Sequence, residues 1–405
     1  MRVELPSHLE TLPAVARLSA KWVFVIGALS ALAPLSIDTY LPALPALSDD
    51  LSASPGQVQL TIAGCLVGLA LGQLAAGPIS DSVGRRAPLL VGLGLYTLAS
   101  LLCAFAPTVW LLTAFRIVQG ASGAAGVVIG RAIARDLYEG AAVVRLFGLT
   151  MLVGGLAPVL APVAGAQLLR VASWRGTFVA LALIGLVLLV AIAATVRETL
   201  APERRVSRGF AGIRTSFAIV SRDGDFVGYV CANALPFAAM FVYIAGSPYV
   251  LQDVYGLSPQ AFSAAFALNA IGIVTAAQIG GRLAGRVHPR RLLACGLGIS
   301  ATGAAGLLAT ALVDGPLVAI LVSLFLVVGA IGLVLPNATA LALRHHRDRA
   351  GSASAVLGAT QFTIGGLAAP VVGLVGTGSA VPMAALIAGL SFAALVPFAV
   401  LTGAD

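Results

Sequence analysis

A chain of 405 residues in which 59% are hydrophobic and only 10% are charged has too few charges to cover the surface of a water-soluble protein. Its net charge of +8 does not indicate nucleic-acid binding, because Lys and Arg collect in alternate loops rather than on a basic helix with interleaved aromatic residues. The four cysteines are isolated and lack the spacing of a zinc or redox motif, so the sequence predicts no metal site.

The apolar residues fall in runs of about 18–25, the length that crosses roughly 30 Å of hydrocarbon as a helix. The forty-six glycines favour closely packed helices over a β-barrel, whose strands would alternate at every second residue. We therefore expect an all-α membrane protein. The twelve predicted spans are 22–44, 57–78, 88–106, 109–130, 144–168, 176–196, 226–250, 260–280, 292–312, 316–341, 352–375 and 380–401.

The first span closes with residues 36–45, which contain Asp38, the only Asp or Glu inside any predicted span. An ionised carboxylate out of water costs several kcal/mol, so such a group is paired, neutralised or functional. Burial favours the protonated form, which would let Asp38 bind a proton on one side of the membrane and release it on the other. The alternative is a carboxylate at the outer, wet end of the helix, because sixteen residues place it about 24 Å along the span.

Arg116 lies seven residues past Val109, where the fourth span begins, and is therefore about 10 Å deep. Asp38 should lie at about the same level, so we expect the two charges to pair and lower each other's burial cost. The alternative is an arginine that bonds backbone carbonyls and only braces the fold.

In the fifth span, Pro158 and Pro162 each remove a backbone donor, and Gly154, Gly155 and Gly165 allow bending and close packing. We expect a bent helix between the two halves of the protein. Alternatively, these prolines and glycines serve only the packing of the helix against its neighbours.

The connection between the second and third spans is echoed by residues 281–291, about half the chain later, with Gly285 where Asp81 would fall. Two pseudo-symmetric six-helix bundles with a binding site between them are therefore predicted. The predicted parts are an N-terminal segment 1–21, bundles 22–196 and 226–405, and a linker 197–225. The uncharged polar candidates for substrate binding, each alternatively a helix–helix hydrogen bond, are Tyr40, Asn233, Tyr243, Asn269, Gln278, Asn337 and Gln361.

Of the 24 Lys and Arg residues, 21 lie in the N-terminal segment, the even-to-odd loops or the adjacent span ends. Arg170 and Arg175 fall on the other face, and Arg116 lies inside a span. The positive-inside rule then places both termini and the linker in the cytoplasm.

Five stretches resemble the major facilitator superfamily. Residues 77–86 match its G-x-x-x-D-x-x-G-R-[KR] signature, and residues 116–120 resemble its R-x-x-Q-G pattern. Residues 154–165 are similar to the glycine–proline motif of its antiporters. Residues 38–45, with 335–341, resemble the Bcr/CflA-type drug:proton antiporters.

The resemblance implies two six-helix bundles that rock around a central cavity, with the first and fourth helices as neighbours and Arg116 linked to proton coupling. We expect a gate in the loop after the second span, where glycines permit a tight turn and Asp81 bonds to the other half. An ordinary positively charged loop is the alternative. The gate residues are Gly77, Asp81, Gly84, Arg85 and Arg86.

The expected function is proton-coupled efflux of small drug-like molecules, such as phenicols or bicyclomycin-like compounds, across a bacterial inner membrane. We expect a monomer in the lipid bilayer whose partners are drug and protons. No ATP-binding or hydrolase motif occurs, so we expect a secondary transporter, not an enzyme, without a cofactor. A proton-coupled importer of a nutrient and a non-transporting sensor or scaffold are the alternatives.

Overall fold

The computed structural model describes residues 19–138, 140–205, 223–344 and 350–402, without the side chains of Arg204 and of several residues within 140–155 and 350–355. The first bundle contains α1 (Ala20–Asp38), η2 (Leu41–Ala43), α2 (Leu44–Asp50), α3 (Pro55–Val83), α4 (Arg86–Ala104), α5 (Val109–Leu137), α6 (Gly140–Leu168) and α7 (Trp174–Thr195). After η3 (Pro202–Arg204), the second contains α9 (Gly224–Tyr249), η4 (Val250–Val254), α10 (Pro259–Leu283), α11 (Pro289–Leu312), α12 (Leu317–Leu343), α13 (Ala350–Ala368), α14 (Val371–Val375) and α15 (Val381–Leu401).

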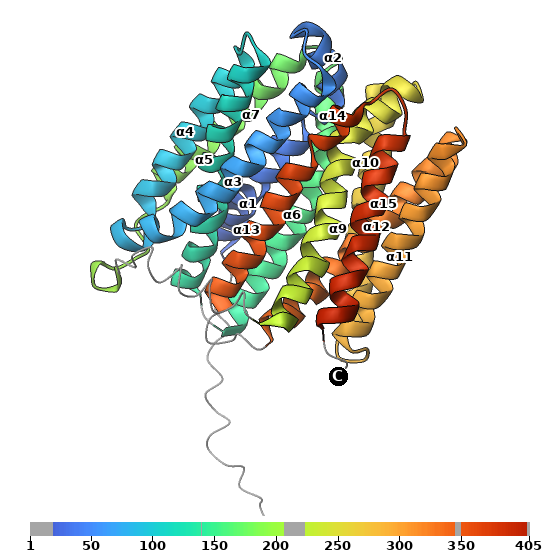
Figure 1. Cartoon of the computed structure of the whole chain (residues 1–405). Coiled ribbons are helices and arrows are strands. Elements are labelled where there is room, and N and C mark those ends of the chain that lie inside the picture. The colour runs from blue at the N-terminus through green and yellow to red at the C-terminus, as the bar shows by residue number, and fades with distance from the viewer. Residues whose placement is uncertain (1–18, 139, 206–222, 345–349, 403–405) are drawn as a thin grey trace, which may run out of the picture.

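The structure confirms an all-α membrane protein. Among the residues searched, eleven helices are long and apolar enough to cross a membrane, and the searched part of α6 adds a shorter apolar helix, Leu156–Leu168. Helices of the two bundles lie side by side in Figure 1, with the first bundle in blue to green and the second in yellow to red.

Two predicted spans end too early in the sequence-based assignment. The second was expected to stop at residue 78 and the fourth at residue 130, but α3 continues to Val83 and α5 to Leu137. The helical hydrogen bonds continue past the apolar run, because turns at the level of the lipid head groups need no apolar side chains. As a result Asp81, Arg131 and Arg135 belong to helices rather than to loops.

The first span also differs from its predicted limits. Helix α1 stops at Asp38, and the chain turns at Thr39 and Tyr40 before η2 begins. Pro42 and Pro45 follow at the starts of η2 and α2, where a missing N–H is tolerated. Asp38 therefore lies at the end of a helix, not within one.

Each bundle contains one very close helix pair that depends on glycine. In the first, a Cβ on Gly68 of α3 would lie 2.1 Å from the carbonyl oxygen of Ile117 on α5. In the second, a Cβ on Gly332 of α12 would lie 2.1 Å from the carbonyl oxygen of Ile273 on α10. Small residues at these positions let the backbones approach, as in other membrane helix pairs.

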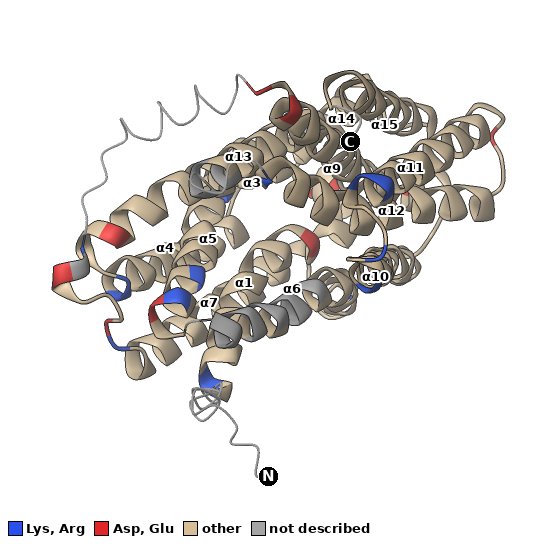
Figure 2. Ribbon diagram, turned by 90° about the horizontal axis from the view of Figure 1, so that it is seen from below, with Lys and Arg blue, Asp and Glu red and all other residues tan. Residues whose placement is uncertain are grey.

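The two bundles meet through α6 against α10 and through α3 against α13. We call the two ends of the molecule the Asp50 end, where α2 lies, and the Arg85 end, where α3 joins α4. Figure 2 looks at the Arg85 end, where Lys and Arg positions lie on helices and on the loops that connect them, while most of the ribbon is uncharged.

The bundles close on each other at the Asp50 end. Gln59 of α3 is fully buried, its Nε2 donates to the carbonyl oxygen of Ala245 (3.0 Å), and its Oε1 accepts from the N–H of Gly373 (2.8 Å). A Cβ on Gly373 would lie 2.3 Å from the Cα of Gly56, so backbone meets backbone at this contact.

Candidate functional site

Asp38 is buried at the C-terminal end of α1, with 5% of its surface exposed. Its carboxylate makes no ion pair or hydrogen bond with any residue that the structure describes. The two carboxylate oxygens are not fully enclosed, however. Each keeps a small solvent-accessible surface. A buried carboxylate in this setting is stable mainly in its neutral, protonated form.

Helices of both bundles surround Asp38. Gly165 of α6 packs on its neighbour, and a Cβ at Gly165 would lie 1.8 Å from the carbonyl oxygen of Thr39. From the second bundle, Tyr243 of α9 lies within electrostatic range of Asp38. The Tyr243 hydroxyl accepts a hydrogen bond from Asn269 Nδ2 (2.9 Å). Of the predicted site residues, Tyr243 and Asn269 are therefore hydrogen-bonded to each other, and Asp38 lies near Tyr243 without a hydrogen bond to it in the described part of the structure.

Arg116 is fully buried and does not pair with Asp38, which corrects the predicted ion pair. Its Nη1 donates to the carbonyl oxygen of Ser36 (2.8 Å) and to Gln119 Oε1 (2.6 Å), and its Nε donates to the carbonyl oxygen of Thr61 (3.3 Å). These acceptors take the place of a carboxylate, so the arginine is held without neutralising Asp38.

Two aromatic rings complete the surroundings of Arg116. The guanidinium carbon lies 4.5 Å from the ring centre of Tyr40 and 5.6 Å from that of Phe178. Both distances suit a cation–π contact. Arg116 Nη2, however, is enclosed and has no partner among the described residues.

The arginine belongs to a polar cluster that ties α1, α3, α4 and α5 together. Ser36 Oγ shares a 2.7 Å hydrogen bond with Tyr96 OH, and Gln119 Nε2 donates to Ser100 Oγ (2.7 Å). Tyr40, a predicted substrate contact, is itself fully buried and shares a 2.9 Å hydrogen bond with Thr61 Oγ1. The structure thus places Tyr40 in the core of the first bundle.

A second charged network lies at the Arg85 end. Arg85 forms ion pairs with Asp81 (2.5 Å) and Asp136 (3.0 Å). Burial acts to lower the pKa of the Arg85 guanidinium, but the two carboxylates outweigh burial and raise it. The chain turns at Gly84, whose φ is +109°, whereas Gly77 lies inside α3. The expected turn at Gly77 is therefore wrong.

Asp81 pairs within its own bundle, since its described partner is Arg85 and not a residue of the second half. Arg86 likewise donates to carbonyl oxygens of its own bundle, Nε to that of Val196 (2.8 Å) and Nη2 to that of Ala193 (2.9 Å). The structure therefore does not show the predicted contact across the halves.

Glu198, just after α7, holds the turn between α3 and α4. Its carboxylate accepts from the N–H groups of Arg85 (2.7 Å) and Arg86 (3.1 Å). Partial burial acts to raise the pKa of this carboxyl group, but these donors and those of Thr199 and Leu200 outweigh burial and lower it. The sequence analysis did not identify Glu198.

The end of α6 contacts α10 across the two bundles. Ser263 Oγ donates to the carbonyl oxygen of Pro162 (3.0 Å), and Gln260 Nε2 donates to that of Ala166 (3.1 Å). Pro158 lies in the same helix and is half-buried. Gly154 and Gly155 fall outside the part of α6 whose side chains the structure describes.

The remaining polar candidates lie in the second bundle. Asn233 Nδ2 donates to Thr339 Oγ1 (3.3 Å), but its Oδ1 is enclosed and has no partner in the described part of the chain. Asn337 bonds the carbonyl oxygen of Leu333 in its own helix (2.8 Å). Gln361 is half-buried on α13 and Gln278 is exposed on α10.

Within the residues searched, no group of three or more His, Cys, Asp or Glu is placed to hold a metal ion.

Sequence reasoning missed Gln59, Arg131 and Arg135. No sequence motif marks Gln59, because its role depends on a contact with the other half of the chain. Arg131 and Arg135 were counted as loop residues, although their four-residue spacing directly after a predicted span is that of one helix face.

Comparison with known proteins gives a consistent result. The Major Facilitator Superfamily model matches residues 20–370. The chain is 39% identical over 365 residues to the uncharacterized MFS-type transporter YdgK of Bacillus subtilis, covering 90% of each chain. It is 29% identical to the bicyclomycin resistance protein homolog of Haemophilus influenzae, over 89% of this chain and 91% of that one. A bacterial homologue of the lysosomal transporter Spinster has the same fold, with a TM-score of 0.76 and 15% identity over 93% of this chain and 95% of that one.

Proposed function

The chain belongs to the Major Facilitator Superfamily and is a transporter rather than an enzyme, and on this basis we propose that it exports small drug-like molecules in exchange for protons. The bicyclomycin resistance protein homolog among its relatives supports a drug as cargo. Neutral or singly charged compounds, such as phenicols or bicyclomycin-like compounds, are the substrates we expect.

One observation carries the proposal of proton coupling. Asp38 is a buried carboxylate without a described partner, placed where α6 and α9 of different halves approach the end of α1. A rearrangement of the halves changes its surroundings and therefore its affinity for a proton. A carboxylate locked in an ion pair would respond much less, because its partner would hold the charge in both states.

Arg116 supports this role without touching the carboxylate. It bonds the backbone of Ser36, two residues before Asp38, and so fixes the last turn of α1. Its Nη2 has no partner among the described residues, which leaves two N–H donors for a group that arrives during the cycle.

The distribution of Lys and Arg supports a cytoplasmic Arg85 end, with both termini in the cytoplasm of a bacterial inner membrane. The closed Asp50 end then faces outward, and the described arrangement corresponds to an inward-facing state. In the proposed cycle Asp38 is protonated when it faces outward and releases the proton inward as drug binds. One charge crossing 100 mV contributes about 2.3 kcal/mol to this exchange.

A drug-susceptibility panel in an exporter-deficient bacterial host tests the proposal. The strains express the natural chain, Asp38→Asn, or Asp49→Asn, a control at an exposed carboxylate on α2. We expect the natural chain and Asp49→Asn to protect against chloramphenicol or bicyclomycin and Asp38→Asn to give no protection at equal membrane abundance. Full protection by Asp38→Asn would contradict the mechanism, and protection against no compound would favour import.

A further inference from the structure

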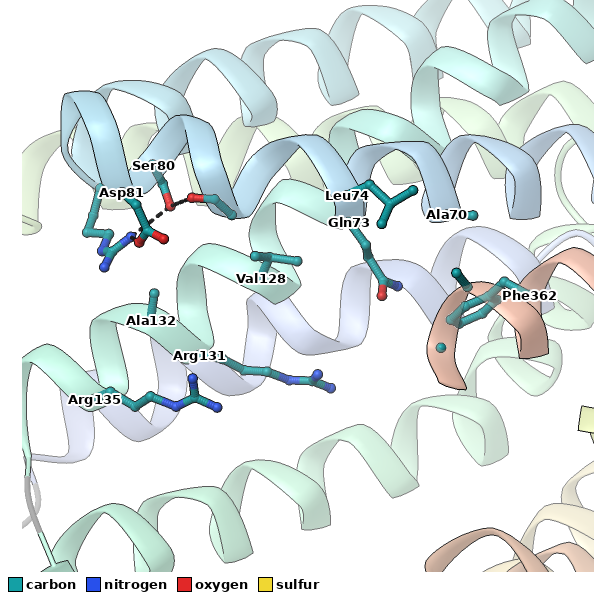
Figure 3. A pocket seen from close by; sticks show the side chains of 14 residues that line it. Ala70, Gln73, Leu74, Ser80, Asp81, Val128, Arg131, Ala132, Arg135 and Phe362 are labelled. Carbon is teal, nitrogen blue, oxygen red and sulfur yellow. Dashed lines mark hydrogen bonds and ion pairs between the residues drawn. The ribbon is translucent and has the colours of Figure 1, made fainter. Parts of the chain in front are cut away.

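A pocket of about 520 Å³ opens at the Arg85 end between α3 and α5 of the first bundle and α13 of the second. Its volume lies within the range of small-molecule sites. The residues that line it are Ala70, Gln73, Leu74, Gly77, Ser80, Asp81, Arg85, Val128, Arg131, Ala132, Arg135, Gly358, Ala359 and Phe362. Figure 3 shows Arg131 and Arg135 extending from α5 and Phe362 coming from α13.

Two of the three arginines in this pocket have no described counter-ion. Arg85 is held by Asp81 and Asp136, so its charge is balanced locally. Arg131 and Arg135 lie one turn apart on the same face of α5, and neither makes a hydrogen bond or ion pair with a described residue. The two guanidinium groups repel each other, and an anion placed between them would relieve that repulsion.

The remaining wall of the pocket is mainly apolar and small. Phe362 presents an aromatic ring from the second bundle, and the small residues Gly358 and Ala359 of the same helix also line the pocket. On α3, Leu74 adds an apolar side chain and Gln73 an uncharged amide that both donates and accepts. Phe362 thus offers the pocket a ring on which a planar group can stack, and the two arginines offer it donors for oxygen atoms.

We propose that this pocket is the entry site for cargo and that Arg131 and Arg135 select aromatic molecules carrying anionic or strongly hydrogen-bond-accepting oxygens over cationic ones. The inference rests on the proposed export function and adds its substrate class. Guanidinium groups bind such oxygens with two parallel donors, whereas they repel an ammonium group at the same position. Each arginine is expected to contribute roughly a tenfold preference for an anion over a cation of the same shape.

A topological role is the competing explanation for both arginines, because positive charge collects at cytoplasmic helix ends and complements the C-terminus of α5. That role needs only charge. Selection by the pocket also needs the guanidinium fork, so lysine variants separate the two explanations.

The test measures binding by isothermal titration to the purified full chain in nanodiscs of neutral lipid, which requires no transport. The probes are 4-nitrobenzoate, 4-nitrobenzyl alcohol and 4-nitrobenzyltrimethylammonium, which share one ring and differ in charge. The variants are Arg131→Gln with Arg135→Gln, the same pair changed to Lys, and Arg286→Gln as a control at an exposed arginine outside the pocket.

We expect the natural chain and Arg286→Gln to prefer the benzoate over the cation by at least about tenfold. The double Gln variant should lose that preference, and the double Lys variant should retain rejection of the cation but bind the benzoate more weakly. Equal preference in the natural chain and the double Gln variant would overturn the proposal. Phe362→Ala should weaken all three probes alike, because it removes the ring contact and no charge.

A repeat in nanodiscs containing phosphatidylglycerol distinguishes lipid from cargo. A lipid site would give two results: benzoate no longer binds in these nanodiscs, and the natural chain retains phosphatidylglycerol while the double Gln variant does not. Both results together would overturn the proposal. The proposed export function is judged separately by drug susceptibility with Asp38→Asn, so failure of either idea leaves the other measurable.

Discussion

Asp38 and Arg116 are an acidic and a basic side chain buried close to the C-terminal end of α1, yet their surroundings differ. Arg116 is surrounded by carbonyl oxygens, an amide oxygen and two aromatic rings. Asp38 faces the second bundle and has no described partner. Arg116 therefore fixes the turn that presents Asp38, and no described residue holds the Asp38 carboxylate.

We expect Arg116→Lys to abolish transport although it keeps the charge. Lysine cannot reach Ser36, Thr61 and Gln119 together, and each buried acceptor left unsatisfied costs about 1–3 kcal/mol. Thermal unfolding in detergent and drug export in cells measure the two effects. Arg286→Lys, at an exposed position, is the control, and unchanged export by Arg116→Lys would refute this assignment.

Glu198 gives a prediction about pH. Its pKa in the folded protein lies below its ordinary value of 4.5, so the stability it contributes is present above that value and is lost as pH falls through the lower folded pKa. We expect the melting temperature of the natural chain to fall more steeply below about pH 4.5 than that of Glu198→Gln. Parallel pH profiles of the two proteins would show that the bonds to Arg85 and Arg86 do not stabilise the turn.

At the scale of helices, composition and apolar run length predict which segments cross the membrane, because the bilayer sets one length for all of them. They do not predict where a helix ends. The limits of α3 and α5 depend on hydrogen bonds that continue into charged turns, so the environment of Asp81 and Arg131 was misjudged. The turn at Gly84 was predictable, since a positive φ favours glycine.

The packing of α6 against the end of α1 yields a test at this scale. We expect Gly165→Ala to destabilise the protein by about 1–3 kcal/mol and to impair export, because the added methyl group collides with the backbone of Thr39 beside Asp38. Gly94→Ala on α4 is the matched control, since nothing lies within 4 Å of its added Cβ and alanine favours the helix there. Equal melting temperatures for the two variants would contradict this account of the contact.

At the scale of the whole molecule, the two bundles are closed at one end and separated by a pocket at the other. Gln59 joins α3 to both α9 and α14 with one side chain, and Ser48 shares a 2.9 Å hydrogen bond with Tyr249 nearby. Such contacts join residues about 200 or more positions apart in the chain, so a single sequence does not reveal them. The motif residues, in contrast, were found because each motif lies within a short stretch.

We expect Gln59→Leu to loosen the Asp50 end. Loss of two hydrogen bonds, each contributing about 0.5–1.5 kcal/mol, corresponds to a shift of about 5- to 150-fold toward the outward-open state. In a chain without native cysteines, a reporter cysteine in place of the buried Ala245 should react faster with a membrane-impermeant thiol reagent. Gln57→Leu, in the capping box of the same helix, should leave the rate unchanged. An unaltered rate with Gln59→Leu would mean that these bonds do not hold the end closed.

Uptake of radiolabelled chloramphenicol into everted membrane vesicles with an acidic lumen measures whether Asp38 couples a proton gradient to drug export. We expect uptake by vesicles with the natural chain, loss of that uptake when a protonophore collapses the gradient, and no gradient-dependent uptake with Asp38→Asn. Equal gradient-driven uptake by the natural chain and Asp38→Asn would contradict this role of Asp38.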